Sequence, residues 1–199
     1  SWSGGVRTSL WGSTCFITLH GGRVMTVIKP LDINDITDPE LKELVEKCEA
    51  LGVPGGEFPR IVARMPEQAK PLLRVMLLNF NEGNVDHRLK EIIRVQLARY
   101  SEEPYNSGLR SIKAKDMGLT EEIIDAGSGD YEDSEFFTES EKVALRYADQ
   151  MFLDSSKVDK ELYDELKKHY TEAQVMELGA FIALFHGAHI AMRSFGSSQ

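Results

Sequence analysis

Apolar residues recur at helical spacing along most of this chain, and each run is bounded by residues that start or stop helices. Asp38 followed by Pro39 is an N-cap with proline at the first helical position, and the Gly- and Pro-rich segment 51–56 ends the run that follows. No stretch alternates apolar and polar residues as a half-buried strand does. The pattern therefore predicts an all-α fold. The other predicted long helices cover 66–81, 86–100, 104–117, 139–153 and 172–195.

Two capping boxes support the helices of the C-terminal half. Thr138 with Glu141, and Thr171 with Gln174, each combine an N-cap hydroxyl with an acid or amide three residues later. The chain has 199 residues, of which 42% are hydrophobic, and this is enough for one domain with a real core. We expect a single all-helical domain over 25–199.

Residues 1–24 differ in composition from the rest of the chain. They hold both tryptophans and contain no Asp, Glu or Lys, so that Arg7 and Arg23 are their charged residues. Glycine and hydroxyl residues interrupt their apolar stretch, and no small-x-small cleavage site follows, which is not typical of a signal peptide. We interpret 1–24 as a leader or an appended segment upstream of a natural start at Met25.

The net charge and the cysteine count exclude several classes of function. The net charge is -9, whereas a nucleic-acid partner requires a basic excess on the surface. No apolar run reaches the ~18 to 20 residues of a membrane-spanning helix, so no membrane partner is expected. Cys15 and Cys48 are too few for a disulfide scaffold or a closed thiolate metal site, which favours a reduced, cytoplasmic setting.

Ionisable residues within apolar helices are candidate functional groups, because a buried charge must be paired or must shift its pKa. Glu91 lies on the apolar stripe of the 86–100 helix. His186 and His189 are three residues apart, and so project to the same side of the apolar 172–195 helix. Each also has a plain structural explanation, with Glu91 at the solvent edge of its helix and the histidines as satisfied core residues.

The junction after residue 100 adds four more candidates, which are Glu103, Tyr105, Asn106 and Arg110. A glutamate at a helix N-terminus is favoured by the helix dipole alone, and Arg110 could be no more than a surface partner of Glu103 or Asn106. The residue types alone do not decide between a functional and a structural role for these four residues.

The stretch 89–124 resembles the core of the carboxymuconolactone decarboxylase and alkylhydroperoxidase D-like family. The resemblance rests on Glu91, on Glu103-Pro104-Tyr105-Asn106 and on Gly118-Leu119-Thr120-Glu121-Glu122-Ile123. The segment 177–196 is similar to the last helix of that family, so the resemblance covers most of 60–196. It implies an alkylhydroperoxidase D-like helical bundle that assembles as a homo-oligomer, a trimer or a hexamer.

The peroxidase branch of this family uses two cysteines and a histidine. In this chain the cysteines fall on Glu103 and Asn106 and the histidine on Arg110, while the family's relay glutamate and tyrosine fall on Glu91 and Tyr105. A carboxylate and an amide cannot form a sulfenic acid or resolve it as a disulfide. The resemblance therefore does not imply alkylhydroperoxidase-like peroxidase activity here.

The decarboxylase branch lacks these cysteines and is the nearer analogue. It implies a cofactor-independent lyase or hydrolase that acts by acid–base chemistry on a small carboxylated or lactone-like substrate. Arginine cannot act as the general acid or base, so Arg110 would bind the substrate carboxylate instead of replacing the branch's histidine in catalysis. The hypothesis assigns catalysis to Glu91, Glu103, Tyr105 and His186. It assigns substrate binding to Arg110, Asn106 and His189.

Two other hypotheses remain. A metal-dependent enzyme could take its ligands from Glu91, Glu103, His186 and His189, a mixed set suited to Zn, Mn or Fe. Alternatively, the chain is a non-catalytic binding or assembly protein that kept the fold. The acid–base hypothesis needs no cofactor and no metal, and it expects a small pocket near the start of the 104–117 helix.

Overall fold

The computed structural model describes residues 27–196, and within that range it contains helices and no strand, as predicted. The interpretation of residues 1–24 and of a start at Met25 concerns residues outside the described range. The long helices are α1 (Pro39–Leu51), α3 (Pro66–Asn81), α4 (His87–Tyr100), α8 (Glu139–Asp154) and α10 (Glu172–Phe195). The short ones are η1 (Ile33–Asp35), α2 (Glu57–Val62), α5 (Pro104–Gly108), α6 (Ile112–Asp116), α7 (Glu121–Gly127), η2 (Ser155–Lys157) and α9 (Lys160–Leu166).

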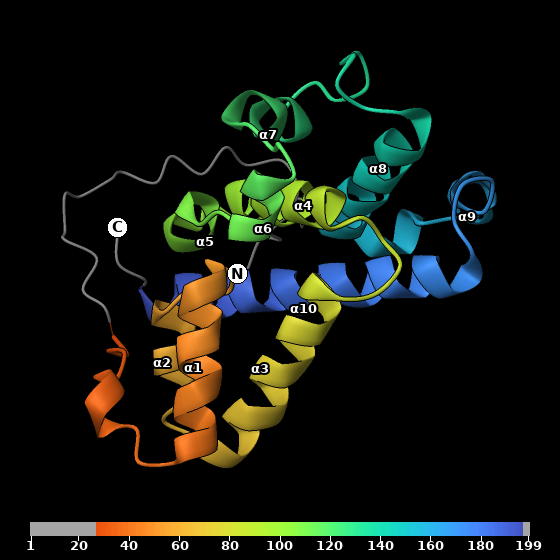
Figure 1. The fold of residues 1–199 in the computed structure, drawn as a ribbon. Coiled ribbons are helices and arrows are strands. Elements are labelled where there is room, and N and C mark those ends of the chain that lie inside the picture. Colours follow the sequence, from red (N-terminus) through yellow and green to blue (C-terminus); the bar gives the residue numbers. More distant parts are fainter. Residues whose placement is uncertain (1–26, 197–199) are drawn as a thin grey trace, which may run out of the picture.

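Helix α10 runs through the middle of the molecule, with α1–α3 on one side and α4–α8 on the other (Figure 1). Its buried face packs on α3, where Phe80 contacts Phe181 and Phe185 with ring centroids 5.9 and 5.5 Å apart. Contrary to expectation, α10 has the length and the apolar composition of a membrane-spanning helix. Within the described range it is the one helix that has both. A helix buried between two layers of a domain needs the same apolar composition.

The local signals that start and end the helices act as predicted. Both capping boxes are formed, at Thr138 and at Thr171. Gly52 ends α1 with a left-handed φ of 79°, and a Cβ there would lie 2.4 Å from the carbonyl oxygen of Arg110. Glycine is therefore required where the segment after α5 passes the end of α1.

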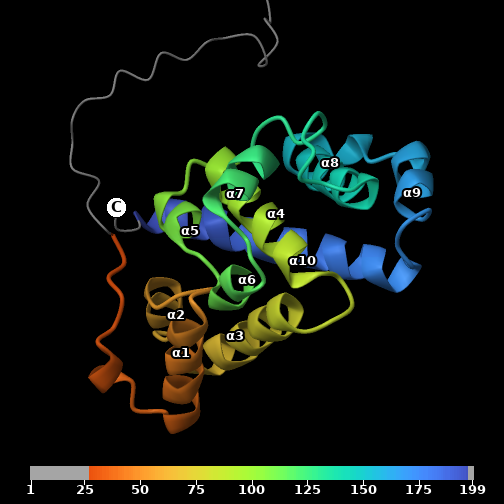
Figure 2. The same ribbon diagram turned by 45° about the horizontal axis from the view of Figure 1, so that its top comes forward.

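The prediction of one helix over 104–117 is wrong, because two short helices occupy this range. Leu109 is extended, with φ -69° and ψ 149°, and Ser111 caps the second helix by accepting a hydrogen bond from the Ala114 amide. Figure 2 shows α4 lying across α10, with α5, α6 and α7 close to α4. The break between α5 and α6 therefore lies beside α4.

Candidate functional site

A fully buried ion pair lies at the position of the family's relay glutamate. Arg94 donates to both carboxylate oxygens of Glu91, from Nε at 2.7 Å and from Nη2 at 2.9 Å, and both side chains are 0% exposed. Glu91 and Arg94 are three residues apart in α4, so they lie one above the other on the same face. Glu91 therefore does not lie at the solvent edge of its helix.

The same ion pair organises the break between α5 and α6. Arg94 also donates to the carbonyl oxygens of Asn106 and Leu109, at 2.7 Å each, and Glu91 accepts from the Ser111 amide at 2.8 Å. The two carbonyls and the Ser111 amide have no helical hydrogen-bond partner in α5 or α6, because the chain between these two helices is not helical. The buried pair thus replaces the hydrogen bonds that a continuous helix would have made.

Glu103 and Tyr105 have partners in the backbone around them. Glu103 is the N-cap of α5, and it accepts from the Tyr105 amide and from the backbone and side-chain nitrogens of Asn106 at 2.7–3.0 Å. The Tyr105 hydroxyl donates to the Pro54 carbonyl and accepts from the Glu57 amide, both at 2.9 Å. Burial raises the pKa of Tyr105 to about 12, so the phenol keeps its proton at neutral pH.

Arg110 points toward α7 and away from the other candidates. It forms a two-pronged ion pair with Glu121, with both distances 2.8 Å, and it donates to the carbonyls of Ser107 and Leu109. The hydrogen bonds to Glu121 raise the pKa of Arg110. Arg110 is therefore an ion-pair partner, as the structural alternative held, but its partner is Glu121 and not Glu103 or Asn106.

His186 is half-buried and faces the C-terminal end of α4. Its Nδ1 lies 3.5 Å from the Ser101 hydroxyl, and its ring meets Phe152 edge-on at a centroid distance of 5.2 Å. Burial lowers the pKa of His186, so the imidazole is neutral at pH 7. A neutral, accessible imidazole next to a hydroxyl is an arrangement that can move a proton.

Two residues that the sequence analysis did not select complete this neighbourhood. Arg193 donates to the Ser101 carbonyl at 2.6 Å and to the Glu102 carboxylate at 3.0 Å. Ser101 itself is buried at the end of α4. The spacing of His186 and Arg193, seven residues or two turns, could have indicated that they share a face of α10.

His189 is fully buried, unlike His186, and neither of its ring nitrogens has a hydrogen-bond partner within residues 27–196. Burial, followed by the positive charge of Arg94, holds the pKa of His189 well below its usual value. The two histidines therefore share a side of α10 but have different surroundings.

The predicted site residues form separate groups. Glu91, Glu103 and Asn106 belong to one buried network through Arg94. Arg110 shares the Leu109 carbonyl with Arg94 but forms its ion pair with Glu121 of α7, and His186 contacts Ser101. In the part of the chain that is described, no three His, Cys, Asp or Glu side chains gather as metal ligands do. Within residues 27–196 the predicted metal set of Glu91, Glu103, His186 and His189 is not brought together, because Arg94 pairs with Glu91 and the other three contact different neighbours.

The cysteine of the described range is not a reactive thiol. Cys48 is buried in α1, and burial raises its pKa to about 12, so it stays protonated. Cys15 lies outside the described residues.

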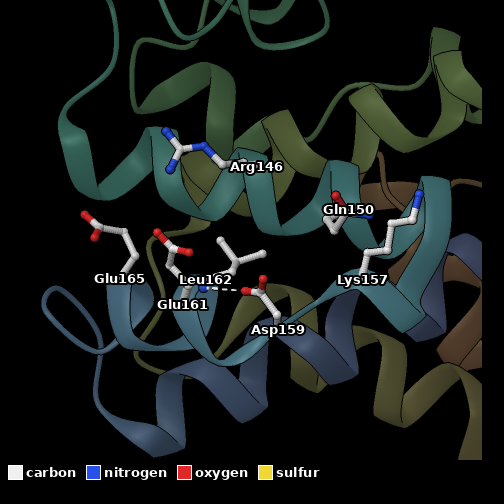
Figure 3. A pocket seen from close by; sticks show the side chains of 7 residues that line it. All are labelled: Arg146, Gln150, Lys157, Asp159, Glu161, Leu162 and Glu165. Carbon is white, nitrogen blue, oxygen red and sulfur yellow. Dashed lines mark hydrogen bonds between the residues drawn. The ribbon is translucent and has the colours of Figure 1, made fainter.

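Three surface hollows lie apart from all seven predicted residues. One, of about 320 Å³, lies between α8 and α9 with charged walls that include Arg146 and Glu165 (Figure 3). An apolar groove of about 370 Å³ is lined by α2, α3 and α10, and a third hollow of about 560 Å³ adjoins the start of α4. The expected pocket at the start of α5 is none of these three.

Comparison with solved structures finds clear similarity in the fold. The debrominase Bmp8 in its apo form superposes with a TM-score of 0.75 and 20% identity, over 88% of this chain and 93% of the other. A cysteine-to-alanine variant of Bmp8 in complex with 2,3,4-tribromopyrrole gives 0.74 and 21%, over 87% and 91%. An alkylhydroperoxidase AhpD core protein from Ralstonia eutropha JMP134, described as uncharacterized and peroxidase-related, gives 0.69 and 12%, over 84% and 90%. No protein-family model and no curated protein sequence matches the chain.

Proposed function

Starting from the AhpD-like fold of this chain, we propose that it is a cofactor-independent lyase or hydrolase acting by acid–base chemistry on a small carboxylated or lactone-like substrate. The observation that supports this proposal is the neutral, half-buried imidazole of His186 beside the Ser101 hydroxyl. The general base is therefore His186, at the C-terminal end of α4.

Glu91 has a positioning role in this proposal. Its oxygens are bound by Arg94 and by the Ser111 amide, and it is fully buried, so it does not meet a substrate. It keeps α4 joined to the α5–α6 break, and Glu103 keeps the start of α5 in place. Sulfur redox chemistry is not proposed, because neither residue can replace a thiolate.

Arg193 is the proposed binding group for the substrate carboxylate, in place of Arg110. Its side chain is 54% exposed, and within residues 27–196 it makes one ion-pair contact, with the still more exposed carboxylate of Glu102. Exposed pairs of this kind contribute little, so a substrate carboxylate can replace Glu102. Arg110, in contrast, is held by two hydrogen bonds to Glu121.

The test is turnover of lactones, β-keto acids and unsaturated carboxylates by the wild-type protein and by His186→Gln. Loss of general base catalysis lowers kcat by roughly 10²–10⁴-fold. His169→Gln, an exposed histidine in the loop after α9, is the matched control and should retain full activity. Equal turnover in the wild type and His186→Gln would remove His186 from the mechanism. No turnover of any of the three substrate classes by the wild type would reject the proposed lyase or hydrolase activity.

The same base predicts a pH dependence. Protonation of His186 removes its ability to accept a proton, and its pKa lies below 6.5 because of burial. We expect kcat/KM to be constant at alkaline pH and to fall as the pH drops through the lowered pKa. A pH–rate profile whose acid limb is unchanged in His186→Gln would contradict this assignment.

We also propose that the protein acts as a cytoplasmic homo-oligomer. Support comes from α10, which leaves Ala183, Leu184 and Gly187 on the wall of the apolar groove next to α3. An open apolar wall of this kind can form a protein–protein contact, and we propose a second copy of this chain as its partner.

A further inference from the structure

We propose that Ser101 is a nucleophile and that this site hydrolyses lactones and simple esters through an acyl-serine intermediate. The inference rests on the proposed function and narrows its substrate class from carboxylated or lactone-like compounds to lactones and simple esters. It adds a covalent step and a second reacting residue to the base already assigned.

The first observation is the contact between Ser101 and His186. Ser101 is 6% exposed, and within the described residues its Oγ makes one hydrogen-bond contact with a side chain, the Nδ1 of His186 at 3.5 Å. A serine hydroxyl becomes a nucleophile when an adjacent base can take its proton. The distance is longer than an ordinary O–H···N bond, and catalytic hydrogen bonds of this kind commonly shorten when substrate binds.

The second observation is the backbone that follows the serine. Glu102 has a φ of 49°, and it is the non-glycine residue of the range 27–196 with a positive φ. This conformation is that of an ordinary helix C-cap, because the Glu102 amide donates to the Arg99 carbonyl and the Glu103 amide donates to the Ala98 carbonyl. The turn at Glu102 ends α4 sharply and leaves the Ser101 side chain facing α10.

Arg193 holds this turn from α10. Its Nη1 donates to the Ser101 carbonyl at 2.6 Å and its Nη2 to the Glu102 carboxylate at 3.0 Å, while the Glu103 amide donates to the Ala98 carbonyl. The guanidinium therefore lies next to the residue that carries the reacting hydroxyl, and it is bound to that residue's backbone carbonyl. A cation near this position favours the negative charge that develops on an attacked carbonyl oxygen.

The tautomer of His186 follows from its role. Nδ1 faces the hydroxyl and must accept its proton, so the ring proton lies on Nε2. The edge-on contact with Phe152, at an interplanar angle of 69°, keeps the ring in this orientation.

The reaction balances without a cofactor. The Ser101 Oγ attacks the lactone carbonyl carbon, and its proton moves to Nδ1 of His186. The ring C–O bond then breaks, and the leaving alkoxide takes that proton, which opens the lactone and leaves an ester on Ser101. Water attacks this ester while His186 takes one of its protons, and Ser101 regains a proton as the hydroxy acid leaves.

The test is covalent labelling of the full-length protein with a fluorophosphonate, followed by mass spectrometry of the intact protein and its peptides. We expect one adduct per chain, on the peptide that contains Ser101, and slower labelling of His186→Gln. Ser101→Ala should lose the adduct and lower lactone turnover by roughly 10²-fold or more. Ser107→Ala, in the same junction with its hydroxyl bonded to the Pro104 carbonyl, is the control and should label as the wild type does.

Several results would overturn the inference. Lactone turnover that persists in Ser101→Ala would show direct attack by water at the His186 base, so that the proposed function survives and the nucleophile does not. An unlabelled wild type that still turns over lactones, or an adduct on another residue, would likewise remove Ser101 as the nucleophile. A wild type that neither labels nor turns over any substrate class would reject both proposals.

A second variant covers the case in which Ser101→Ala does not fold. Ser101→Cys keeps the shape of the side chain and places a thiol beside His186. The imidazole would then take the proton of this thiol. Iodoacetamide should then alkylate position 101 faster than the buried Cys48, and addition of His186→Gln should remove that advantage. Equal alkylation rates with and without His186 would overturn the pairing of the two residues.

Discussion

At the scale of single residues, Arg94 determines what the neighbouring acids can do. It binds Glu91 and two backbone carbonyls, and each of these contacts is buried. A buried charge is tolerated when it is both paired and hydrogen-bonded, but it becomes costly once its partner is removed. Glu91 is thus held for structural reasons at a position where the resemblance suggested catalysis.

The first prediction concerns this ion pair. Glu91→Gln leaves the Arg94 guanidinium buried without a counter-charge, and we expect the free energy of unfolding to fall by about 3–5 kcal/mol. Glu121→Gln removes the exposed partner of Arg110, and should cost about 1 kcal/mol or less. Urea denaturation of both variants measures the difference. A small loss for Glu91→Gln, equal to that of the control, would show that the pair is dispensable.

The second prediction concerns His189 and pH. The pKa of His189 is lowered in the folded protein by burial and by the charge of Arg94, so the unfolded chain binds more protons below pH 6.5. The contribution of neutral His189 to the free energy of unfolding is therefore fully present above pH 6.5. It is lost as the pH drops toward the pKa of His189 in the folded protein, by at most about 1.4 kcal/mol per pH unit for one group.

His189→Leu should reduce this acid loss, since it removes the titrating group. At pH 8 the substitution should be neutral or stabilising, because it also removes two nitrogens without partners. Denaturation at pH 8 and pH 5.5, with His169→Gln as the exposed control, measures both effects. An unchanged pH dependence in His189→Leu would assign the acid loss to other groups, such as the buried His87.

At the scale of helices, close packing decides where glycine is required. Gly127 ends α7 against α4, and a Cβ there would lie 2.3 Å from Cγ2 of Ile92, which is fully buried. At Gly108, the last residue of α5, an added Cβ meets nothing within 4 Å. The two glycines end similar short helices in different surroundings.

The third prediction compares them. Gly127→Ala should lower the free energy of unfolding by about 1–3 kcal/mol, because Ile92 or α7 must shift. Gly108→Ala should change it by no more than about 1 kcal/mol, since only backbone freedom is affected. Thermal unfolding of the two variants tests this, and equal effects would mean that α7 does not pack tightly on α4.

At the scale of the whole molecule, α10 connects the two layers and also reaches the surface. The face that contacts α3 and α4 is buried, whereas the wall of the apolar groove is open to solvent. The proposed oligomer would cover this wall.

The fourth prediction tests that assembly. The wild type should sediment as a trimer or hexamer, and Ala183→Glu should sediment as a monomer with unchanged helicity, because a charge would be buried at the contact. Leu153→Glu, a change at an exposed position on α8, is the control. A wild-type monomer, or an Ala183→Glu variant that stays assembled, would place the contact elsewhere or reject it.

The sequence by itself determined the elements that depend on neighbours within one or two turns. The apolar spacing, the two capping boxes and the stop after α1 predict the long helices, and the motif around Glu121 indicates the fold. Short helices such as α2, α7 and α9 were not predicted, because few residues leave little periodicity to detect.

Only the tertiary structure decided the pairing of polar groups across longer distances. Arg94 is one of many charged residues in the sequence, and its burial depends on where α5 and α6 approach α4. The contact of Ser101 with His186 joins residues 85 positions apart, and the separation of Arg110 from Glu91 follows from the turn of the chain after Leu109. Such contacts depend on how helices pack, which local spacing does not encode.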